Sequence, residues 1–284
     1  MISGISGTTV VAGVAGSPVS HSLSPTLHNA WIAAAGIDAV YVAFAPPASG
    51  FARFVESMRG AVVRGLNVTA PFKEQALALA DRASDRARRA WAANLLIFED
   101  DGSIWADNTD GEGLLAAFAA QAPGFDPAPG PAIILGAGGA ARGAAAAFLD
   151  AGAPVVRIVN RGEARARDLA AALGDRVEVF SVEMAEQAMA GANAIVNATP
   201  LVAWASSPLF LEARATRGAV AMDMVYRPLD TDFLRQARMG GLRTVDGLAM
   251  LIGQAGPSFE RLFGRPPPAL DVRAVALAKL EASA

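Results

Sequence analysis

A lysine and an aspartate stand at two junctions of the chain where their side chains could exchange a proton. Lys73 lies just inside an expected helix, and Asp110 belongs to the polar run Asp107-Asn-Thr-Asp-Gly111. An amine and a carboxylate beside a cleft can act as an acid/base pair. A lysine considered by itself is instead typical of a solvated surface. Asn67 and Thr69 share one face of the preceding strand and add hydrogen-bonding groups next to Lys73.

Two serines form a second polar pair near the start of the chain. Ser22 and Ser24 alternate in the loop before Pro25, where we expect a helix to begin. Hydroxyl groups together with the free amides of a helix N-terminus suit a bound carboxylate. Serine is also a common N-cap residue, so a purely structural role stays open.

A third motif follows the short apolar run Ile133–Leu135, which we interpret as a buried strand. The run ends in Gly136-Ala-Gly-Gly-Ala-Ala141, and an alanine-rich helix comes next. In this setting Gly136 permits a tight turn, Gly138 lets the backbone approach a pyrophosphate, and Ala141 lets the helix pack close to the sheet. A strand before and a helix after favour a dinucleotide site over a merely glycine-rich turn.

The next strand, Val155–Val159, ends in residues that could select the cofactor. In a dinucleotide fold this strand end contacts the adenosine ribose, where an acidic residue would accept a bond from a free 2′-hydroxyl. The chain has Asn160 and Arg161 there, and Arg165 one helical turn further on. Two guanidinium groups suit a 2′-phosphate, so the pattern favours NADP over NAD. Glu163 could pair with either arginine and leave both as ordinary solvated residues.

Composition limits the classes of function. The 284 residues suffice for two domains, and 53% hydrophobic with 18% charged residues indicates a globular protein. A net charge of −3 gives no basic field for nucleic acid or an anionic membrane. Without cysteine, disulfides, thiolate nucleophiles and zinc–thiolate sites are excluded, and two histidines make a metal cluster unexpected. We see no signal peptide and no apolar run of about 20 residues, so we expect a cytoplasmic protein. As partners we expect a small-molecule substrate, and as assembly a monomer or homodimer.

Strands and helices alternate along the chain, which predicts an α/β protein with mostly parallel sheets. In the first part we expect strands at 10–14, 39–45 and 65–69, helices at 26–35, 50–59 and after Pro71, and a hairpin formed by 93–98 and 103–106. A helix at 111–120 leads into Ala122–Pro131, where four prolines in ten residues make the clearest linker. A second α/β unit follows, with strands at 133–135, 155–159, 177–179, 194–196, 219–223 and 242–245 and a helical end at 248–284 broken at Pro266–Pro268.

Eight short motifs extend over nearly the whole chain, from about Val10 to Phe259. They are His21-Ser-Leu-Ser-Pro25, Asn67-Val-Thr-Ala-Pro-Phe-Lys73, Asp107-Asn-Thr-Asp-Gly111, Gly136-Ala-Gly-Gly-Ala140, Asn160-Arg161, Asn197-Ala-Thr-Pro200, Asp223-Met-Val-Tyr226 and Asp246-Gly-Leu-Ala-Met-Leu251. In type and order they resemble the motifs of shikimate dehydrogenases. The resemblance implies an α/β substrate-binding domain at 1–110, a doubly wound Rossmann-type NADP-binding domain at 111–246, and C-terminal helices at 247–284 that pack back on the first domain.

The resemblance also implies an activity, the NADPH-dependent reduction of 3-dehydroshikimate to shikimate on the route to aromatic amino acids. Lys73 would be the catalytic acid/base with Asp110 as its partner, and Ser22 and Ser24 would hold the substrate carboxylate. The ring hydroxyls would be bound by Asn67, Thr69, Asn94, Asp110 and Gln254, with Tyr226 nearby. The cofactor would be bound by Gly136, Ala137, Gly138, Gly139, Ala140, Asn160, Arg161, Arg165, Thr199, Met224, Gly247 and Met250, with Asp85 near the nicotinamide end.

Four positions depart from the pattern of these enzymes. Trp91 and Val202 stand where glycine is usual, Leu95 replaces a threonine, and Ala249 replaces a common glycine. The changes leave the reaction type intact but open the alternative of quinate or another polyhydroxylated ring acid as substrate. Trp91 either lines the pocket or fills the core behind it, and we favour the core. A non-catalytic NADP-binding sensor is a further alternative, which the presence of both Lys73 and Asp110 disfavours.

Overall fold

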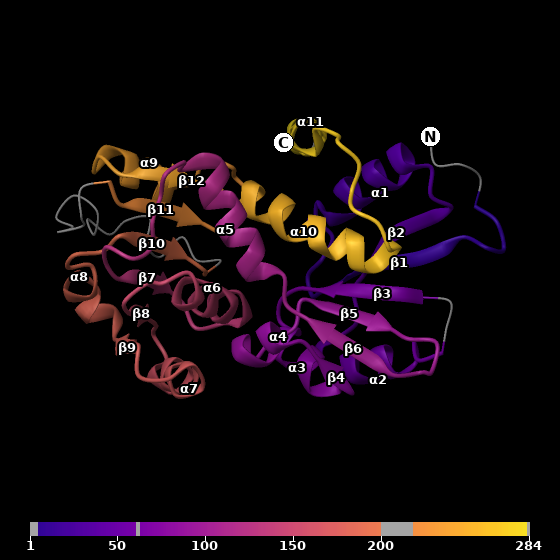
Figure 1. Cartoon of the computed structure of the whole chain (residues 1–284), viewed down its shortest axis with the longest axis horizontal. Coiled ribbons are helices and arrows are strands. Elements are labelled where there is room, and N and C mark those ends of the chain that lie inside the picture. Colours follow the sequence, from indigo (N-terminus) through magenta and orange to yellow (C-terminus); the bar gives the residue numbers. More distant parts are fainter. Residues whose placement is uncertain (1–4, 61–62, 200–217, 283–284) are drawn as a thin grey trace. The chain divides into compact units, whose positions relative to one another are not determined.

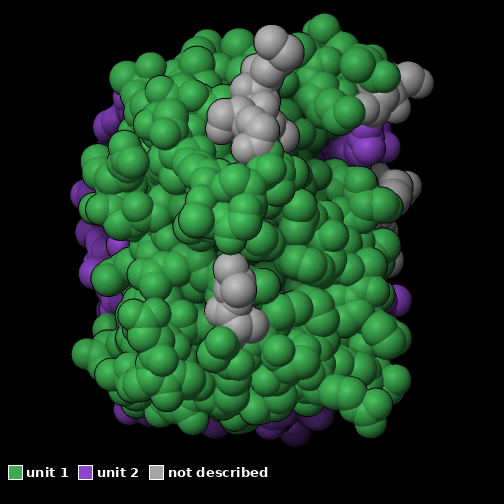
Figure 2. Space-filling view, turned by 90° about the vertical axis from the view of Figure 1, so that its right-hand side faces the viewer, with its two compact units in different colours: residues 1–109, 254–284 green, residues 110–253 purple. Residues whose placement is uncertain are grey.

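The chain folds into two α/β units. The computed structural model describes residues 5–60, 63–199 and 218–282. One unit comprises residues 1–109 and 254–284, and the other comprises residues 110–253 (Figure 2). The chain therefore passes from one unit to the other after Thr109, and returns between Gly253 and Gln254. The return of the C-terminal segment to the first unit confirms the expectation from the sequence.

The first unit is built on a six-stranded sheet with the strand order β2-β1-β3-β5-β6-β4. Only β5 runs against its neighbours, because a hairpin turn at Asp100–Gly102 reverses the chain between β5 and β6. The remaining pairs are parallel, so the prediction of a mostly parallel sheet is confirmed. The strands are β1 (Val10–Ala15), β2 (Ala39–Phe44), β3 (Val63–Val68), β4 (Arg82–Ala83), β5 (Leu95–Phe98) and β6 (Ile104–Asp107).

Helices cover both faces of this sheet. On one face Phe51 and Phe72 stack with ring centroids 4.2 Å apart and join Leu66 and Leu96 of the sheet in a buried core. On the other face the C-terminal helix lies beside the first helix (Figure 1), and the Leu262 side chain packs against Gly65 of β3. The helices are α1 (Ser24–Ala35), α2 (Phe51–Glu56), α3 (Lys73–Leu79), α4 (Asp85–Ala90), α10 (Gly247–Phe263) and α11 (Val272–Glu281), with a 3₁₀ turn η1 (Ala48–Gly50).

The second unit contains a fully parallel six-stranded sheet in the order β12-β11-β10-β7-β8-β9. Successive strands proceed outward from β7 in one direction and then from β10 in the other. This is the doubly wound order, and the change of direction between β7 and β10 creates the switch point where such sheets bind ligands. The strands are β7 (Ala132–Leu135), β8 (Val156–Val159), β9 (Val177–Phe180), β10 (Ala194–Asn197), β11 (Val220–Asp223) and β12 (Arg243–Val245).

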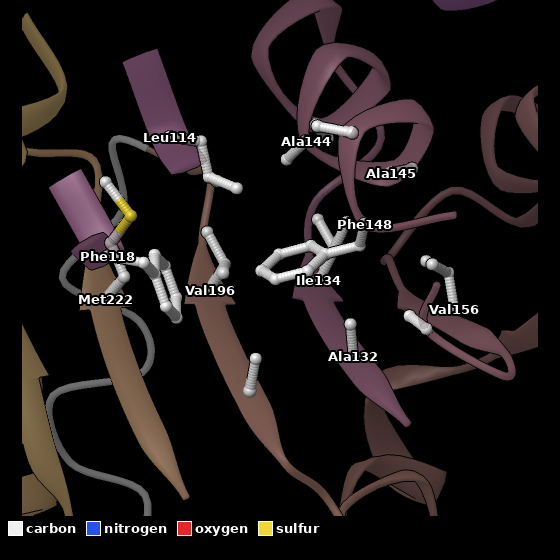
Figure 3. Packing of buried hydrophobic residues seen from close by; sticks show 14 of the residues in the cluster. Leu114, Phe118, Ala132, Ile134, Ala144, Ala145, Phe148, Val156, Val196 and Met222 are labelled. Carbon is white, nitrogen blue, oxygen red and sulfur yellow. The ribbon is translucent and has the colours of Figure 1, made fainter. Parts of the chain in front are cut away.

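Alternate strand residues of the second unit face two separate cores. Ile134 and Val196 point toward Phe118 and Phe148, whose rings meet edge to face at 5.5 Å (Figure 3). The intervening strand residues, such as Ile133, face the opposite core. Two covered faces explain why these strands are continuous apolar runs. The helices are α5 (Asp110–Gln121), α6 (Gly139–Asp150), α7 (Glu163–Leu173), α8 (Ala185–Ala188) and α9 (Asp232–Met239), with a 3₁₀ turn η2 (Val182–Met184).

The expected strands and helices are present, with bounds shifted by a few residues. The sequence missed β4, because a two-residue strand carries no periodicity. The proline-rich segment 122–131, expected as a linker, connects α5 to β7 inside the second unit. In the part of the chain that the structure describes, no helix is long and apolar enough to cross a membrane.

The prediction that Trp91 is a core residue is also wrong. Its side chain is 51% exposed, and its backbone caps the C-terminus of α4 in the left-handed conformation, with φ 48° and ψ 35°. A helix that ends this way favours glycine, since a Cβ atom is strained there. The glycine that the resemblance leads one to expect at this position therefore reflects the cap, and Trp91 takes the cap despite the strain.

The strain can be isolated by comparing two variants that both lack the indole ring. We expect Trp91→Gly to be more stable than Trp91→Ala by about 1 kcal/mol in urea unfolding, because only glycine adopts this conformation freely. Arg89, inside the same helix, is the control position, where the alanine variant should be the more stable by a similar amount. An alanine advantage at both positions would disprove strain at Trp91.

Candidate active site

Three predicted substrate-binding residues belong to one buried hydrogen-bond network in the first unit. Asn67 lies in β3 and Asn94 directly precedes β5, and their exposed fractions are 6% and 2%. The Asn67 Nδ2 group donates to the Asn94 carbonyl oxygen at 3.1 Å, and Asn94 Nδ2 donates to Gln254 Oε1 at 3.3 Å. The structure thus brings Asn67, Asn94 and Gln254 together from segments far apart in the sequence.

Thr109 and Ser258 complete this network, and the sequence analysis did not assign them a role. Thr109 donates its N–H to Asn94 Oδ1 at 2.8 Å and its hydroxyl to the Gln254 carbonyl at 3.0 Å. Ser258 Oγ accepts from Asn67 Nδ2 at 2.9 Å. A sequence signal existed for Ser258, because it follows Gln254 by four residues and so shares its helix face.

Lys73 is the first residue of α3 and is half-buried. Its carbonyl oxygen accepts the N–H of Ala93 at 2.8 Å, so its backbone is fixed next to the segment that carries Asn94. Thr69 follows β3, with its N–H bonded to the Ala15 carbonyl at 2.9 Å. The chain has only two lysines among 24 cationic residues. Lysine can release its proton whereas arginine cannot, so its use at this position suits proton transfer.

The two serines and Asp85 lie at helix starts of the first unit. Ser24 is buried and is the first residue of α1, but the N-cap residue is Leu23, so the alternative that a serine serves only as the N-cap is wrong. Ser22 Oγ instead accepts the N–H of Ser24 at 3.3 Å. Asp85 is fully exposed at the start of α4, with Arg88 3.9 Å away.

Asp107 anchors the polar loop that follows β6. Its carboxylate is fully buried and accepts bonds from Ser84 Oγ at 2.5 Å, Arg86 Nε at 2.6 Å and the Asn108 N–H at 2.8 Å. Burial alone would raise the pKa of Asp107, but the hydrogen bonds and charge of Arg86 and the Ser84 bond hold it below its ordinary value. The carboxylate is therefore ionised and fixes the loop leading to Thr109.

In the second unit the glycine turn leaves open backbone between β7 and α6. Gly136 has φ +115°, and a Cβ there would lie 2.8 Å from Thr199 Cγ2. A Cβ at Gly138 would meet nothing within 4 Å, so the backbone is accessible there. Gly139 begins α6, and the predicted cofactor residues Gly136–Ala140 occupy its N-terminal approach. An open turn at a helix N-terminus fits the pyrophosphate of a dinucleotide.

The end of β8 presents the predicted phosphate-binding cations. Arg161 and Arg165 are both exposed, and Asn160 Nδ2 donates to the Gly162 carbonyl at 2.8 Å. Glu163 forms its ion pair with Arg167 at 2.5 Å. Glu163 therefore pairs with Arg167, one turn along α7, whereas the alternative from the sequence paired it with Arg161 or Arg165. A donor set of two guanidinium groups fits a 2′-phosphate.

The ends of β10 and β11 are joined by a buried carboxylate. Asp223 accepts from Asn197 Nδ2 at 3.0 Å, the Val225 N–H at 3.0 Å and Thr231 Oγ1 at 2.7 Å. Burial raises the pKa of Asp223, and these three hydrogen bonds offset only part of the rise. Asn197 Oδ1 in turn accepts the Thr199 hydroxyl at 2.8 Å.

The other predicted site residues lie in separate elements of the chain. Asp110 is buried at the first position of α5, and Tyr226 is half-buried in the loop after β11. Gly247 is required by close approach, since its Cβ would lie 2.5 Å from the Met224 carbonyl oxygen. Met250 is 7% exposed and belongs to the core beneath the sheet. Of the four departures, Leu95 is buried in β5, Ala249 is half-buried in α10, and Val202 lies outside the described residues.

A doubly wound parallel sheet, an open glycine turn and two cations at the next strand end define the class of dinucleotide-binding α/β proteins. The family profile described as "Shikimate dehydrogenase substrate binding domain" matches residues 14–96, and that described as "Shikimate / quinate 5-dehydrogenase" matches residues 127–221. A protein of Caulobacter vibrioides named shikimate dehydrogenase (NADP(+)) is 56% identical over 98% of both chains. This chain therefore belongs to the shikimate dehydrogenase family.

Solved structures agree with this family assignment. The shikimate 5-dehydrogenase of Thermus thermophilus in complex with NADP(H) and shikimate is 34% identical, with a TM-score of 0.80 over 97% of this chain and 100% of that one. The quinate dehydrogenase of Corynebacterium glutamicum in complex with NAD is 27% identical, with a TM-score of 0.83 over 96% and 99%. The fold is thus shared across members named for different ring acids and cofactors.

The buried carboxylates of Asp107 and Asp223 should respond differently to neutralisation. At neutral pH we expect Asp107→Asn to lower the free energy of unfolding by about 2 kcal/mol, because it breaks a buried ion pair. The matched variant Asp223→Asn should stay within about 0.5 kcal/mol of the unaltered protein or exceed it, since it removes a buried charge whose hydrogen bonds all come from neutral groups of the described chain.

The pH dependence of unfolding distinguishes the two groups further. The folded-state pKa of Asp107 is below the ordinary 3.8, so its stabilisation is present above that value and lost as the pH falls through the folded pKa. The pKa of Asp223 is raised, so its stabilisation exists below 3.8 and is lost as the pH rises through the folded pKa. Urea unfolding at a series of acid pH values measures how the free energy of unfolding changes with pH. The same pH dependence for Asp107→Asn and Asp223→Asn would contradict the opposite pKa shifts of the two carboxyl groups.

Proposed function

We propose that this protein interconverts 3-dehydroshikimate and shikimate with NADP(H), a step of aromatic amino-acid biosynthesis. The observation that carries the proposal is the 56% identity, over 98% of the chain, to a protein named shikimate dehydrogenase (NADP(+)). The Thermus relative was solved in complex with both NADP(H) and shikimate. Relatives at 56% and 45% identity are both named for shikimate and NADP, whereas the relative named for quinate is 27% identical, so quinate is not favoured. Because these relatives are named as enzymes, a non-catalytic sensor is not favoured either.

The substrate side of the proposal uses the first unit. Asn67, Asn94 and Gln254 form a buried polar network, which is costly to bury unless its groups meet polar partners. We assign the ring hydroxyls of the substrate to these amides and to Thr69, Asp110 and Tyr226. Ser22 and Ser24, at the start of α1, are assigned to the substrate carboxylate.

The catalytic step is a hydride transfer coupled to a proton transfer. When bound, NADPH supplies the hydride that adds to the carbonyl carbon of 3-dehydroshikimate. As electrons move onto the carbonyl oxygen, the Lys73 ammonium stabilises the developing charge and delivers its proton, so that an alcohol forms and Lys73 becomes neutral. Asp110 is assigned to hold the ammonium and to accept a bond from a neighbouring ring hydroxyl. In the opposite direction Lys73 accepts the alcohol proton.

The cofactor side of the proposal uses the second unit. Gly136–Ala140 at the start of α6 are assigned to the pyrophosphate, and Asn160, Arg161 and Arg165 to the 2′-phosphate ribose. Toward the nicotinamide end we assign Thr199, Met224, Gly247, Met250 and Asp85. We also expect the protein to act in the cytoplasm as a monomer or homodimer, and sedimentation of the purified chain measures the latter.

Replacing the proposed proton donor should remove turnover while leaving cofactor binding intact. We expect Lys73→Ala to lower kcat for NADP-linked shikimate oxidation by about a thousandfold, the usual contribution of general acid–base catalysis. The affinity for NADPH, measured by fluorescence titration, should be unchanged. Lys279→Ala removes the other lysine, exposed on α11, and should leave kcat unaltered. Near-normal turnover of Lys73→Ala would disprove the assignment, and NADPH binding by the unaltered protein without turnover of any ring acid would favour a sensor.

Selection of NADP over NAD should depend on the two exposed arginines of the second unit. We expect Arg161→Ala and Arg165→Ala each to raise KM for NADP about tenfold, because each loses a charge-assisted bond to the 2′-phosphate. KM for NAD, which lacks that phosphate, should not change. Arg167→Ala is the matched control, since this arginine of the same helix is paired with Glu163. An equal rise in KM for NADP and for NAD would show that the arginines act on something other than the 2′-phosphate.

A further inference from the structure

A buried tyrosine lies directly behind the proposed substrate-binding amide. Tyr41, in the edge strand β2, is 1% exposed, and its hydroxyl donates to Asn67 Oδ1 at 2.8 Å. Neither the motifs nor the proposed mechanism use this residue. Because the phenol hydroxyl bonds the single amide oxygen of Asn67, this contact can determine the orientation of that oxygen.

The hydrogen bonds of Asn67 determine which way its amide faces. Its two Nδ2 hydrogens go to the Asn94 carbonyl at 3.1 Å and to Ser258 Oγ at 2.9 Å. A carbonyl only accepts, so the nitrogen must face Asn94 and the oxygen must face Tyr41. Tyr41 is therefore the donor of that bond. With both amide hydrogens committed, one lone pair of Oδ1 is what Asn67 retains for a ligand, and a lone pair accepts a hydroxyl hydrogen.

Tyr41 is itself held on both its backbone and its ring by consecutive residues of α1. Asn29 accepts the Tyr41 N–H at 3.0 Å and donates to the Tyr41 carbonyl at 2.8 Å. The His28 ring stacks on the phenol with centroids 4.1 Å apart and planes 3° apart. His28 is fully buried, and neither of its ring nitrogens has a hydrogen-bond partner among the described residues.

This environment keeps the stacked pair uncharged. Burial lowers the pKa of His28 to about 3, and burial raises the pKa of Tyr41 well above its ordinary value. His28 is thus a neutral aromatic platform, and Tyr41 keeps the proton it donates to Asn67 over the whole working range of pH. The direction of the bond is therefore constant.

We propose that Tyr41 is a positioning residue: its hydroxyl holds the Asn67 amide oxygen so that the remaining lone pair accepts a ring hydroxyl of the substrate. The inference rests on the proposed function, because it assumes that Asn67 binds the ring acid. Tyr41 touches neither substrate nor cofactor in this scheme. Tyr41 affects substrate binding through Asn67, and α1 contributes by holding Tyr41 in place.

The test is removal of the single hydroxyl group. Tyr41→Phe keeps the ring on His28 and should raise KM for shikimate about fivefold, the usual net value of one hydrogen bond, with kcat within about twofold. KM for NADP should not change. Thr9→Val is the matched control, because it removes another buried hydroxyl of the first unit, bonded to Asp38 at 2.6 Å, and should leave both constants unaltered.

A double-mutant cycle then separates positioning from general damage. In an Asn67→Ala background, or Asn67→Ser should the alanine variant not fold, adding Tyr41→Phe should leave shikimate affinity by calorimetry unchanged. The inference would be overturned if Tyr41→Phe lowered shikimate affinity equally with and without Asn67. It would also be overturned if Tyr41→Phe alone left KM for shikimate unchanged, whether or not kcat and Tm fell. Absence of shikimate oxidation by the unaltered protein would overturn the proposed function and this inference with it.

Discussion

The side chain of Asn94 holds together the parts of the first unit on which the proposed substrate site depends. Its amide bonds Thr109 and Gln254, and its backbone carbonyl bonds Asn67. Thr109 is the last residue before the chain leaves this unit, and Gln254 is the first after it returns. A single buried amide therefore fixes both passages of the chain and the amide behind the proposed substrate position. An amide suits this task because it donates and accepts at once, without the penalty of burying a charge.

Two buried carboxylates show how the same residue type serves different ends. Asp107 has a guanidinium partner and is held ionised, which anchors the loop before Thr109. Among the described residues Asp223 receives hydrogen bonds from neutral donors, and its pKa is raised, which places a proton-sensitive group next to the loop that carries Met224 and Tyr226. The difference arises from one neighbouring arginine. In physical terms the first carboxylate stabilises the fold, while the second organises polar backbone at the strand ends of the other unit.

The sequence predicted the positions in the fold of those candidate site residues whose information is local. The glycine turn, the two arginines and the position of Lys73 follow from the spacing of neighbouring residues around strand ends, and the structure places each in the expected element. The contacts of Tyr41, Thr109 and Ser258 could not be predicted in this way, because Asn67 and Ser258 meet across 191 positions of sequence. The contacts of Thr109 and Ser258 depend on how α10 returns to the first sheet, and those of Tyr41 depend on how α1 and β3 lie relative to β2, which no local pattern reveals.

Trp91 shows a different reason for failure. A large aromatic in an apolar segment is usually buried, and that tendency outweighed the clue that glycine is usual at this position. The backbone at a helix end decided the outcome, since the left-handed cap directs the side chain by geometry rather than by hydrophobicity. The proline-rich segment 122–131, by contrast, is a connection as its prolines indicate, and it joins α5 to β7.

The bonds from Asn29 to the backbone of Tyr41 have a consequence for how this protein meets its own copies. Val10 N–H bonds the Asp38 carbonyl and Gly16 N–H bonds the Phe44 carbonyl, so the even-numbered residues of β2 direct their backbone N–H and carbonyl groups toward β1. The backbone N–H and carbonyl of Tyr41 therefore point to the open edge of the sheet. Its N–H and carbonyl would be an open template for a foreign strand, in a segment of Val-Tyr-Val-Ala-Phe without charge. The Asn29 amide occupies both groups at the centre of that edge. The addition of a strand from another copy is thereby opposed at the centre of β2.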